Sequence, residues 1–123
     1  MGAAENAVVR ACMDQLTLLG VPHIRNNTGA QLIPGTATTR RRFVKFGTTG
    51  WPDIIGVLPD GKFLGVECKA PDKLWGRKRK TDLSPEQQKV RYQLLSHHAL
   101  WITAKSGQEM VSDLKTEGYF QDC

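Results

Sequence analysis

The stretch that decides the fold is GWPDIIGVLPDGKFLGVECK, residues 50–69. It contains two apolar runs, Asp53–Leu58 and Lys62–Val66, which are joined by Pro59-Asp60-Gly61. A Pro-Asp-Gly sequence between two apolar runs favours a type I turn followed by a left-handed glycine, which closes a three-residue hairpin loop. The stretch therefore predicts an antiparallel hairpin in which residue 58 pairs with residue 62.

The register of this hairpin brings two acidic residues together. If residue 58 faces residue 62, the numbers of paired residues sum to 120, so Asp53 lies opposite Glu67. Directly opposed residues on antiparallel strands have Cβ atoms about 4.5 to 5.5 Å apart, and like charges at that distance destabilise the sheet. Lys69 follows Glu67 by two positions and shares its face of the strand. We therefore expect two carboxylates and one ammonium in a single cluster.

Such a cluster has the composition of a divalent metal site. Mg²⁺ prefers oxygen ligands and usually takes one or two carboxylates together with waters and a phosphate, and Asp53 and Glu67 would supply that pair. The bound metal would polarise a phosphate and lower the pKa of a bound water, while Lys69 orients or activates the nucleophile. The alternative is that the three residues form a salt-bridge ladder on the protein surface, where ion pairs are common.

The rest of the chain predicts one α/β domain over residues 1–123. Apolar residues at three- and four-residue intervals predict a first helix over about 3–19, which Gly20 and Pro22 end. The sequence Ser84-Pro85-Glu86-Gln87 predicts a second helix to about residue 96, with Ser84 as its N-cap. The remaining segments are apolar strands at 21–24 and 99–104, a polar loop at 25–31, a basic strand at 38–46 and a last helix at 108–117. We expect the order helix, three strands, helix, strand, helix.

The composition is that of one ordinary folded domain. Of the 123 residues, 40% are hydrophobic and 24% are charged, which is far from the signature of a disordered chain. The three cysteines are widely spaced and form neither a disulfide framework nor a zinc-ligand pattern, so we expect an intracellular, cytoplasmic protein. The N-terminal residues contain neither a basic leader nor a long apolar span, so we expect neither secretion nor membrane insertion.

The charge balance indicates a partner made of phosphates. The chain has 17 Lys and Arg against 12 Asp and Glu, which gives a net charge of +5. Basic and polar residues flank the acidic cluster in the sequence on both sides and are candidates for contacts with nucleic acid, although they could also be solvated loop charges. These candidates are Arg25, Asn27, Arg40, Arg41, Arg42, Lys45, Arg77, Lys78, Arg79 and Lys80.

The motifs together resemble a known family. The order Gly50-Trp51-Pro52-Asp53, an apolar strand, a glycine turn and Val66-Glu67-Cys68-Lys69 resembles the signature of the PD-(D/E)XK nucleases. After a short basic gap, Leu83-Ser84-Pro85-Glu86-Gln87 resembles the VRR-NUC branch of that superfamily. The resemblance covers roughly residues 3–106, and the ordered set of motifs is more specific than either short string alone.

The resemblance implies a restriction-endonuclease-like core, a mixed central β-sheet flanked by helices. It also implies a metal bound by Asp53, Glu67 and the backbone carbonyl of Cys68, with a catalytic role for Lys69. An acidic residue in the first helix near the site corresponds to Glu5, which could instead pair with the positive end of the helix dipole. Gln87 matches a glutamine close to the catalytic centre and is also a capping-box residue. A Gln-x-x-x-Tyr motif of neighbouring branches would place Gln88, with Tyr92, at that position instead.

These observations predict an endonuclease that hydrolyses DNA phosphodiesters with Mg²⁺ or Mn²⁺. The resemblance to junction-resolving enzymes implies branched DNA, including Holliday junctions, as a substrate class, and a homodimer that brings two sites to two strands. The alternative is a nucleic-acid-binding domain of the same fold without catalytic activity, against which the intact Asp53, Glu67 and Lys69 argue. A third hypothesis is a structural protein in which the motif is incidental.

Overall fold

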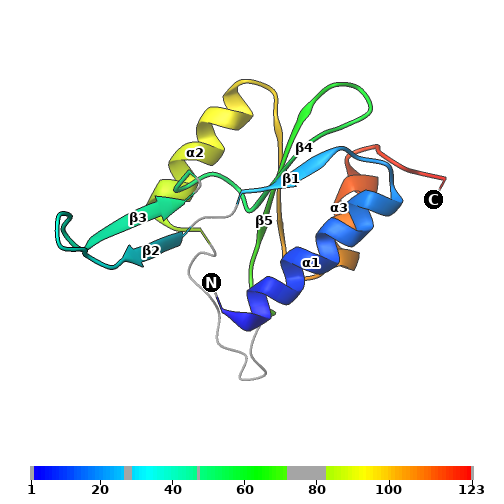
Figure 1. The fold of residues 1–123 in the computed structure, drawn as a ribbon. Helices are drawn as coiled ribbons and strands as arrows, with labels where there is room; N and C mark the ends of the chain where they lie inside the picture. Colours follow the sequence, from blue (N-terminus) through cyan, green and yellow to red (C-terminus); the bar gives the residue numbers. More distant parts are fainter. Residues whose placement is uncertain (1, 27–28, 47, 72–82, 123) are drawn as a thin grey trace.

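Three helices and six strands make up the described part of the chain (Figure 1). The computed structural model describes residues 2–26, 29–46, 48–71 and 83–122. The helices are α1 (Ala3–Leu18), α2 (Pro85–Ser96) and α3 (Gly107–Thr116). The strands are β1 (His23–Arg25), β2 (Gly29–Ile33), β3 (Arg42–Phe46), β4 (Ile54–Val57), β5 (Phe63–Cys68) and β6 (Leu100–Ala104).

Four of the strands form a mixed central sheet in the order β1-β4-β5-β6. The pairs β1–β4 and β4–β5 are antiparallel, whereas β6 runs parallel to β5. A parallel neighbour needs a crossover connection, and α2 lies within the segment that supplies it. The predicted α/β class with a mixed sheet and flanking helices is therefore confirmed.

The hairpin β4–β5 has the predicted register. Ile54 pairs with Val66, and Leu58 N–H donates to the Lys62 carbonyl at 2.9 Å, so the paired numbers sum to 120 as expected. Gly61 N–H donates to the Leu58 carbonyl, and Gly61 has a φ of +86°, in the left-handed region that the turn requires. Strand β5 continues beyond its predicted end at Val66 to Cys68, where it pairs with β6.

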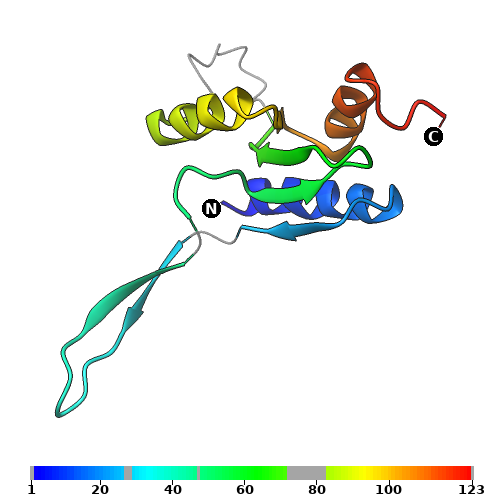
Figure 2. The same ribbon diagram turned by 90° about the horizontal axis from the view of Figure 1, so that it is seen from above.

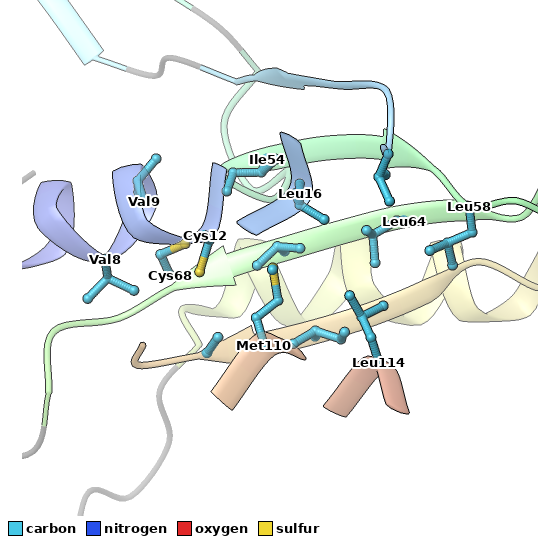
Figure 3. Packing of buried hydrophobic residues seen from close by; sticks show 14 residues of the cluster. Val8, Val9, Cys12, Leu16, Ile54, Leu58, Leu64, Cys68, Met110 and Leu114 are labelled. Atoms are coloured by element: carbon cyan, nitrogen blue, oxygen red, sulfur yellow. The ribbon is translucent and has the colours of Figure 1, made fainter. Parts of the chain in front are cut away.

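One face of the central sheet carries the hydrophobic core. Alternate residues of β4, β5 and β6 point toward α1 and α3, which pack beside each other on this face (Figure 3). The core includes Val9, Cys12 and Leu16 of α1 and Met110 and Leu114 of α3, all of them fully buried. Helix α2 lies against the opposite face, beside β6, and none of its residues is fully buried.

The predicted element order was wrong in one respect. Five strands, not three, precede α2, because β2 and β3 form a separate two-stranded sheet. Part of the segment predicted as a loop, 25–31, belongs to β2, and the predicted strand 38–46 is a strand only over Arg42–Phe46. The pairing partner of β3 is thus a polar segment that shows no β-strand alternation. Of the strands before α2, only β1, β4 and β5 belong to the central sheet.

The helix ends follow local capping rules. Ser84 accepts a hydrogen bond from Gln87 N–H, and the Gln87 side chain accepts one from Ser84 N–H, so the predicted capping box is present. Helix α3 begins at Ser106, whose side chain accepts from Glu109 N–H, and Gly118 follows its end with a φ of +97°. Among the described residues, no helix is both long enough and apolar enough to cross a bilayer.

Candidate active site

Four residues from three segments converge on the face of the sheet opposite the core. Asp53 immediately precedes β4, Glu67 lies in β5, Lys69 follows β5, and Gln87 lies in the first turn of α2. The confirmed register continues by one residue to place Asp53 opposite Glu67, with their side chains on one face. The two carboxylates therefore do not lie on opposite sides of the sheet.

The segment before Asp53 is held down by close packing and hydrogen bonds. A Cβ atom on Gly65 would lie only 2.5 Å from Pro52 Cγ, so Pro52 rests directly on the backbone of β5. Asn26 N–H donates to the Asp53 carbonyl at 2.7 Å. The Asn26 side chain also bonds both the N–H and the carbonyl of Thr48, at 3.1 Å each. These contacts fix the backbone from which the Asp53 side chain projects.

Hydrogen bonds connect the four side chains to the sheet and to one another. Asp53 Oδ2 accepts from the Cys68 N–H at 2.8 Å. Gln87 Nε2 donates to Glu67 Oε2 at 2.7 Å, and Lys69 Nζ donates to Gln87 Oε1 at 3.1 Å. Lys69 Nζ also lies 3.4 Å from Glu67 Oε2, within ion-pair distance. The ammonium and the amide therefore share one oxygen of Glu67.

Burial changes the chemistry of the acidic pair. Asp53 is 6% exposed and Glu67 is 2% exposed, so the alternative of a surface salt-bridge ladder is wrong. Burial raises the pKa of Asp53 above its ordinary value. Burial, followed by the charge of Asp53, raises the pKa of Glu67 to about 7. Among the described residues, the two carboxylates face one ammonium, that of Lys69, so these three groups carry a net negative charge when both acids are ionised.

The donor chemistry of the pair fits a divalent cation. Glu67 Oε1 is buried and has no hydrogen-bond partner among the described residues, whereas Oε2 has two neighbours. An orphaned carboxylate oxygen beside a second buried carboxylate is what a hard cation would satisfy. Within the described ranges, no set of three or more His, Cys, Asp and Glu side chains is grouped as ligands. The side chains thus supply two acidic donors.

Two other residues were expected at the site, Glu5 through its side chain and Cys68 through its backbone carbonyl. Glu5 is half-buried in the first turn of α1, and its charge contributes to the raised pKa of Asp53. Cys68 points its side chain into the core, where it lies beside Cys12 (Figure 3). The alternation of the strand turns the Cys68 side chain away from the acidic face, as expected.

Gln87 serves both of the roles that its sequence context suggested. Its Oε1 accepts from Ser84 N–H at 2.9 Å and completes the capping box, while its Nε2 contacts Glu67. Gln88 instead donates to the Leu83 carbonyl. Tyr92, its partner in the alternative motif, is largely exposed. The geometry therefore places Gln87, and not Gln88, against the acidic pair.

Replacing Gln87 by Glu is expected to destabilise the metal-free protein at pH 8 by about 1 kcal/mol or more. A glutamate at this position can still complete the capping box. It cannot donate to Glu67, and it brings a third carboxylate to the site. The difference from the parent should shrink toward pH 5, where these acids become protonated. Thermal unfolding in chelator at both pH values measures it.

The matched control for this variant is Gln93→Glu, which adds the same charge at an exposed position further along α2. It should unfold within about 0.5 kcal/mol of the parent at both pH values. Equal effects of the two substitutions would contradict the assigned role of Gln87.

The residues expected to contact nucleic acid are distributed differently. Arg40, Arg41 and Arg42 are exposed at and beside the start of β3, away from the acidic cluster. Arg25 is half-buried and donates to Asn6 Oδ1 at 2.6 Å, so it also serves to join β1 to α1. Lys45 lies in β3. Asn27, Arg77, Lys78, Arg79 and Lys80 lie outside the described residues.

Sequence reasoning missed the structural role of Asn26. Its side chain reaches across 22 positions to Thr48. No periodicity reports such a contact, because it depends on where the chain returns after β3. The only available signal was its place between an apolar strand and a polar loop, where Asn commonly bonds nearby backbone groups.

Comparison with known protein families and with curated proteins finds no match for this chain.

Proposed function

We propose that the chain is a metal-dependent DNA endonuclease whose site is formed by Asp53, Glu67, Lys69 and Gln87. The observation that carries this proposal is the buried acidic pair with an ammonium beside it, in which one carboxylate oxygen has no partner within the described part of the chain. Proteins rarely bury two adjacent carboxylates with a single counter-charge, because desolvation opposes ionisation. Perturbed acids grouped in this way are typical of functional sites.

Mg²⁺ or Mn²⁺ fits the pair, with Asp53 and Glu67 as carboxylate ligands and the Cys68 carbonyl as the third ligand that the motif implies. When bound, the ion supplies Lewis-acid stabilisation of phosphoryl charge and lowers the pKa of a bound water. Lys69 would hold its ammonium toward the phosphate or the attacking water. Gln87 would fix the position of Lys69 through the 3.1 Å hydrogen bond and hold one oxygen of Glu67.

The substrate class is DNA, including branched forms, and the assembly is a homodimer. One site of this size cuts one strand, so symmetric cleavage of a four-way junction needs two sites related by a twofold axis. Sedimentation or light scattering of the purified protein measures the oligomeric state directly.

The test is a cleavage assay on end-labelled linear, flapped and four-way-junction DNA, with Mg²⁺, Mn²⁺ or chelator. Lys69→Met keeps the length of the side chain and removes its charge, and we expect it to slow cleavage by about 100-fold or more. Cleavage by the parent should stop in chelator. Salt-sensitive DNA binding without cleavage would identify a silent binding domain instead, and the absence of both would identify a structural protein.

A further inference from the structure

The two-stranded sheet β2–β3 stands apart from the rest of the molecule. Its strands pair from Gly29 with Phe46 to Ile33 with Arg42, and Figure 2 shows the resulting ribbon extending away from the body. At about 3.4 Å per residue, each five-residue strand spans about 17 Å. The ribbon is therefore a projecting arm and adds no strand to the central sheet.

The turn at the end of the ribbon is organised by its own side chains. Thr36 Oγ1 accepts from the N–H groups of Thr38 and Thr39, and Thr36 N–H donates to the Thr39 carbonyl at 3.0 Å. These bonds form a compact hydroxyl-rich turn from side chains of the turn itself. Arg40, Arg41 and Arg42 follow this turn directly and are exposed.

The charged residues of the ribbon are all basic. Residues 29–46 contain Arg40, Arg41, Arg42 and Lys45 and no acidic residue, and the whole interval between Asp14 and Asp53 has none. Subtracting these four charges from the net charge of +5 leaves +1 for the rest of the chain. A projection with this charge attracts polyanions and repels a second basic ribbon.

The ribbon also exposes an apolar pair. Leu32 and Phe43 face each other across the two strands, and they are 42% and 72% exposed. An exposed apolar pair on a charged projection indicates a contact surface. Together with the charge, it fits the major groove of duplex DNA, which admits a two-stranded ribbon, presents phosphates at its rims and carries thymine methyl groups on its floor.

The base of the ribbon is tied to the acidic site. Asn26 and Thr48 flank the ribbon in sequence, and their mutual hydrogen bonds hold its two ends together. Asn26 N–H also donates to the Asp53 carbonyl. A duplex held by the ribbon would thus be placed at a fixed distance from Asp53.

We propose that the ribbon β2–β3 enters the major groove of duplex DNA, with Arg40, Arg41 and Arg42 on phosphates and with Phe43 and Leu32 against base edges. The link to strand cleavage rests on the proposed nuclease function. The binding itself does not, so it can be measured in chelator, where no metal-dependent cleavage takes place.

The test compares two charge-matched double variants. Arg40→Ala/Arg41→Ala removes two charges from the ribbon, and Lys62→Ala/Lys115→Ala removes two from outside it, at the β4–β5 turn and in α3. Fluorescence anisotropy in chelator measures the affinity for a duplex between about 50 and 200 mM salt. The ribbon variant should bind about tenfold or more weakly, and its salt slope should be smaller by about 1.8. The control should bind within about twofold of the parent. Equal losses in the two variants would overturn the proposal.

A third variant tests the apolar contact. Phe43→Ser should weaken duplex binding about threefold or more without changing the salt slope, because it removes no charge. A duplex with uracil in place of thymine should reduce the difference between Phe43→Ser and the parent. If Phe43→Ser instead converts a dimer into a monomer and leaves duplex binding unchanged, the ribbon is a contact between two copies and the proposal is wrong.

The outcomes separate this proposal from the nuclease function. If the parent does not cut DNA but the ribbon variants lose binding as described, the groove proposal stands and the nuclease proposal fails. If the parent cuts DNA and the ribbon variants bind and cut as well as the control, the groove proposal fails alone.

Discussion

Replacing Asp53 by Asn is expected to slow metal-dependent cleavage by about a thousandfold or more, while the metal-free protein becomes more stable. The amide oxygen of Asn can accept the Cys68 N–H that Asp53 Oδ2 accepts at 2.8 Å, so the backbone should keep its position. The variant lacks the charge that a divalent ion needs. It also relieves the repulsion that raises the pKa of Glu67.

Two measurements are needed for this variant. Single-turnover cleavage with Mg²⁺ reports the loss of activity, and thermal unfolding in chelator at pH 8 reports the gain in stability. Asp14→Asn, which removes an exposed acid from α1, is the matched control and should change neither property. Cleavage by Asp53→Asn within tenfold of the parent would contradict the assignment of Asp53 as a metal ligand.

The second large effect is the dependence of metal-free stability on pH. The pKa of Glu67 is about 7 in the folded protein, above its ordinary value of 4.5. The folded state therefore holds this proton more tightly than the unfolded state. Ionisation of Glu67 therefore lowers the free energy of unfolding. This loss of stability is absent below about pH 4.5, grows as the pH rises to about 7, and is complete above that.

Glu67→Gln should remove this dependence. At 1.36 kcal/mol per pKa unit, the full loss of stability is on the order of 3 kcal/mol, and this figure already includes the attraction of Glu67 to Lys69. We expect the variant in chelator to be about 3 kcal/mol more stable than the parent at pH 8 and equal to it near pH 4.5. Denaturant unfolding across this range measures the difference.

Magnesium binding should stabilise the folded parent protein at pH 8. A ligand that binds only the folded state raises the free energy of unfolding. Once the ligand concentration exceeds Kd, the increase grows with the logarithm of the ratio of that concentration to Kd. Millimolar Mg²⁺ should therefore raise the melting temperature of the parent at pH 8 and leave that of Glu67→Gln nearly unchanged. Equal shifts in both proteins would place the ion elsewhere.

The acidic site could be predicted from the sequence because two local rules, turn chemistry and strand register, determine it. Pro59-Asp60-Gly61 defines the turn, and the turn defines the register, which brings Asp53 opposite Glu67. The capping motif placed Gln87 at the start of a helix in the same way. These rules could not predict that Asp53 and Glu67 are buried, because their burial depends on how α2 and the segment around Pro52 cover the pair.

The same patterns predicted β3, within the basic strand at 38–46, but neither β2 nor the contacts at the base of the ribbon. Strand β2 has the sequence GAQLI, with one β-branched residue and no alternation, and it is a strand because β3 pairs with it. The bonds between Asn26 and Thr48 depend on the return of the chain after β3. Propensity and periodicity describe neighbours in sequence, so contacts of this kind lie beyond them.

Helix α2 contributes Gln87 to the site although it buries none of its own residues fully. An element with so little apolar burial opens locally at a lower free energy than the whole domain, so its amides should exchange with solvent early. When its first turn unwinds, Glu67 and Lys69 lose the amide that joins them. Assembly of the proposed site is thus coupled to the docking of α2, and ligands that favour the assembled site should slow amide exchange along this helix.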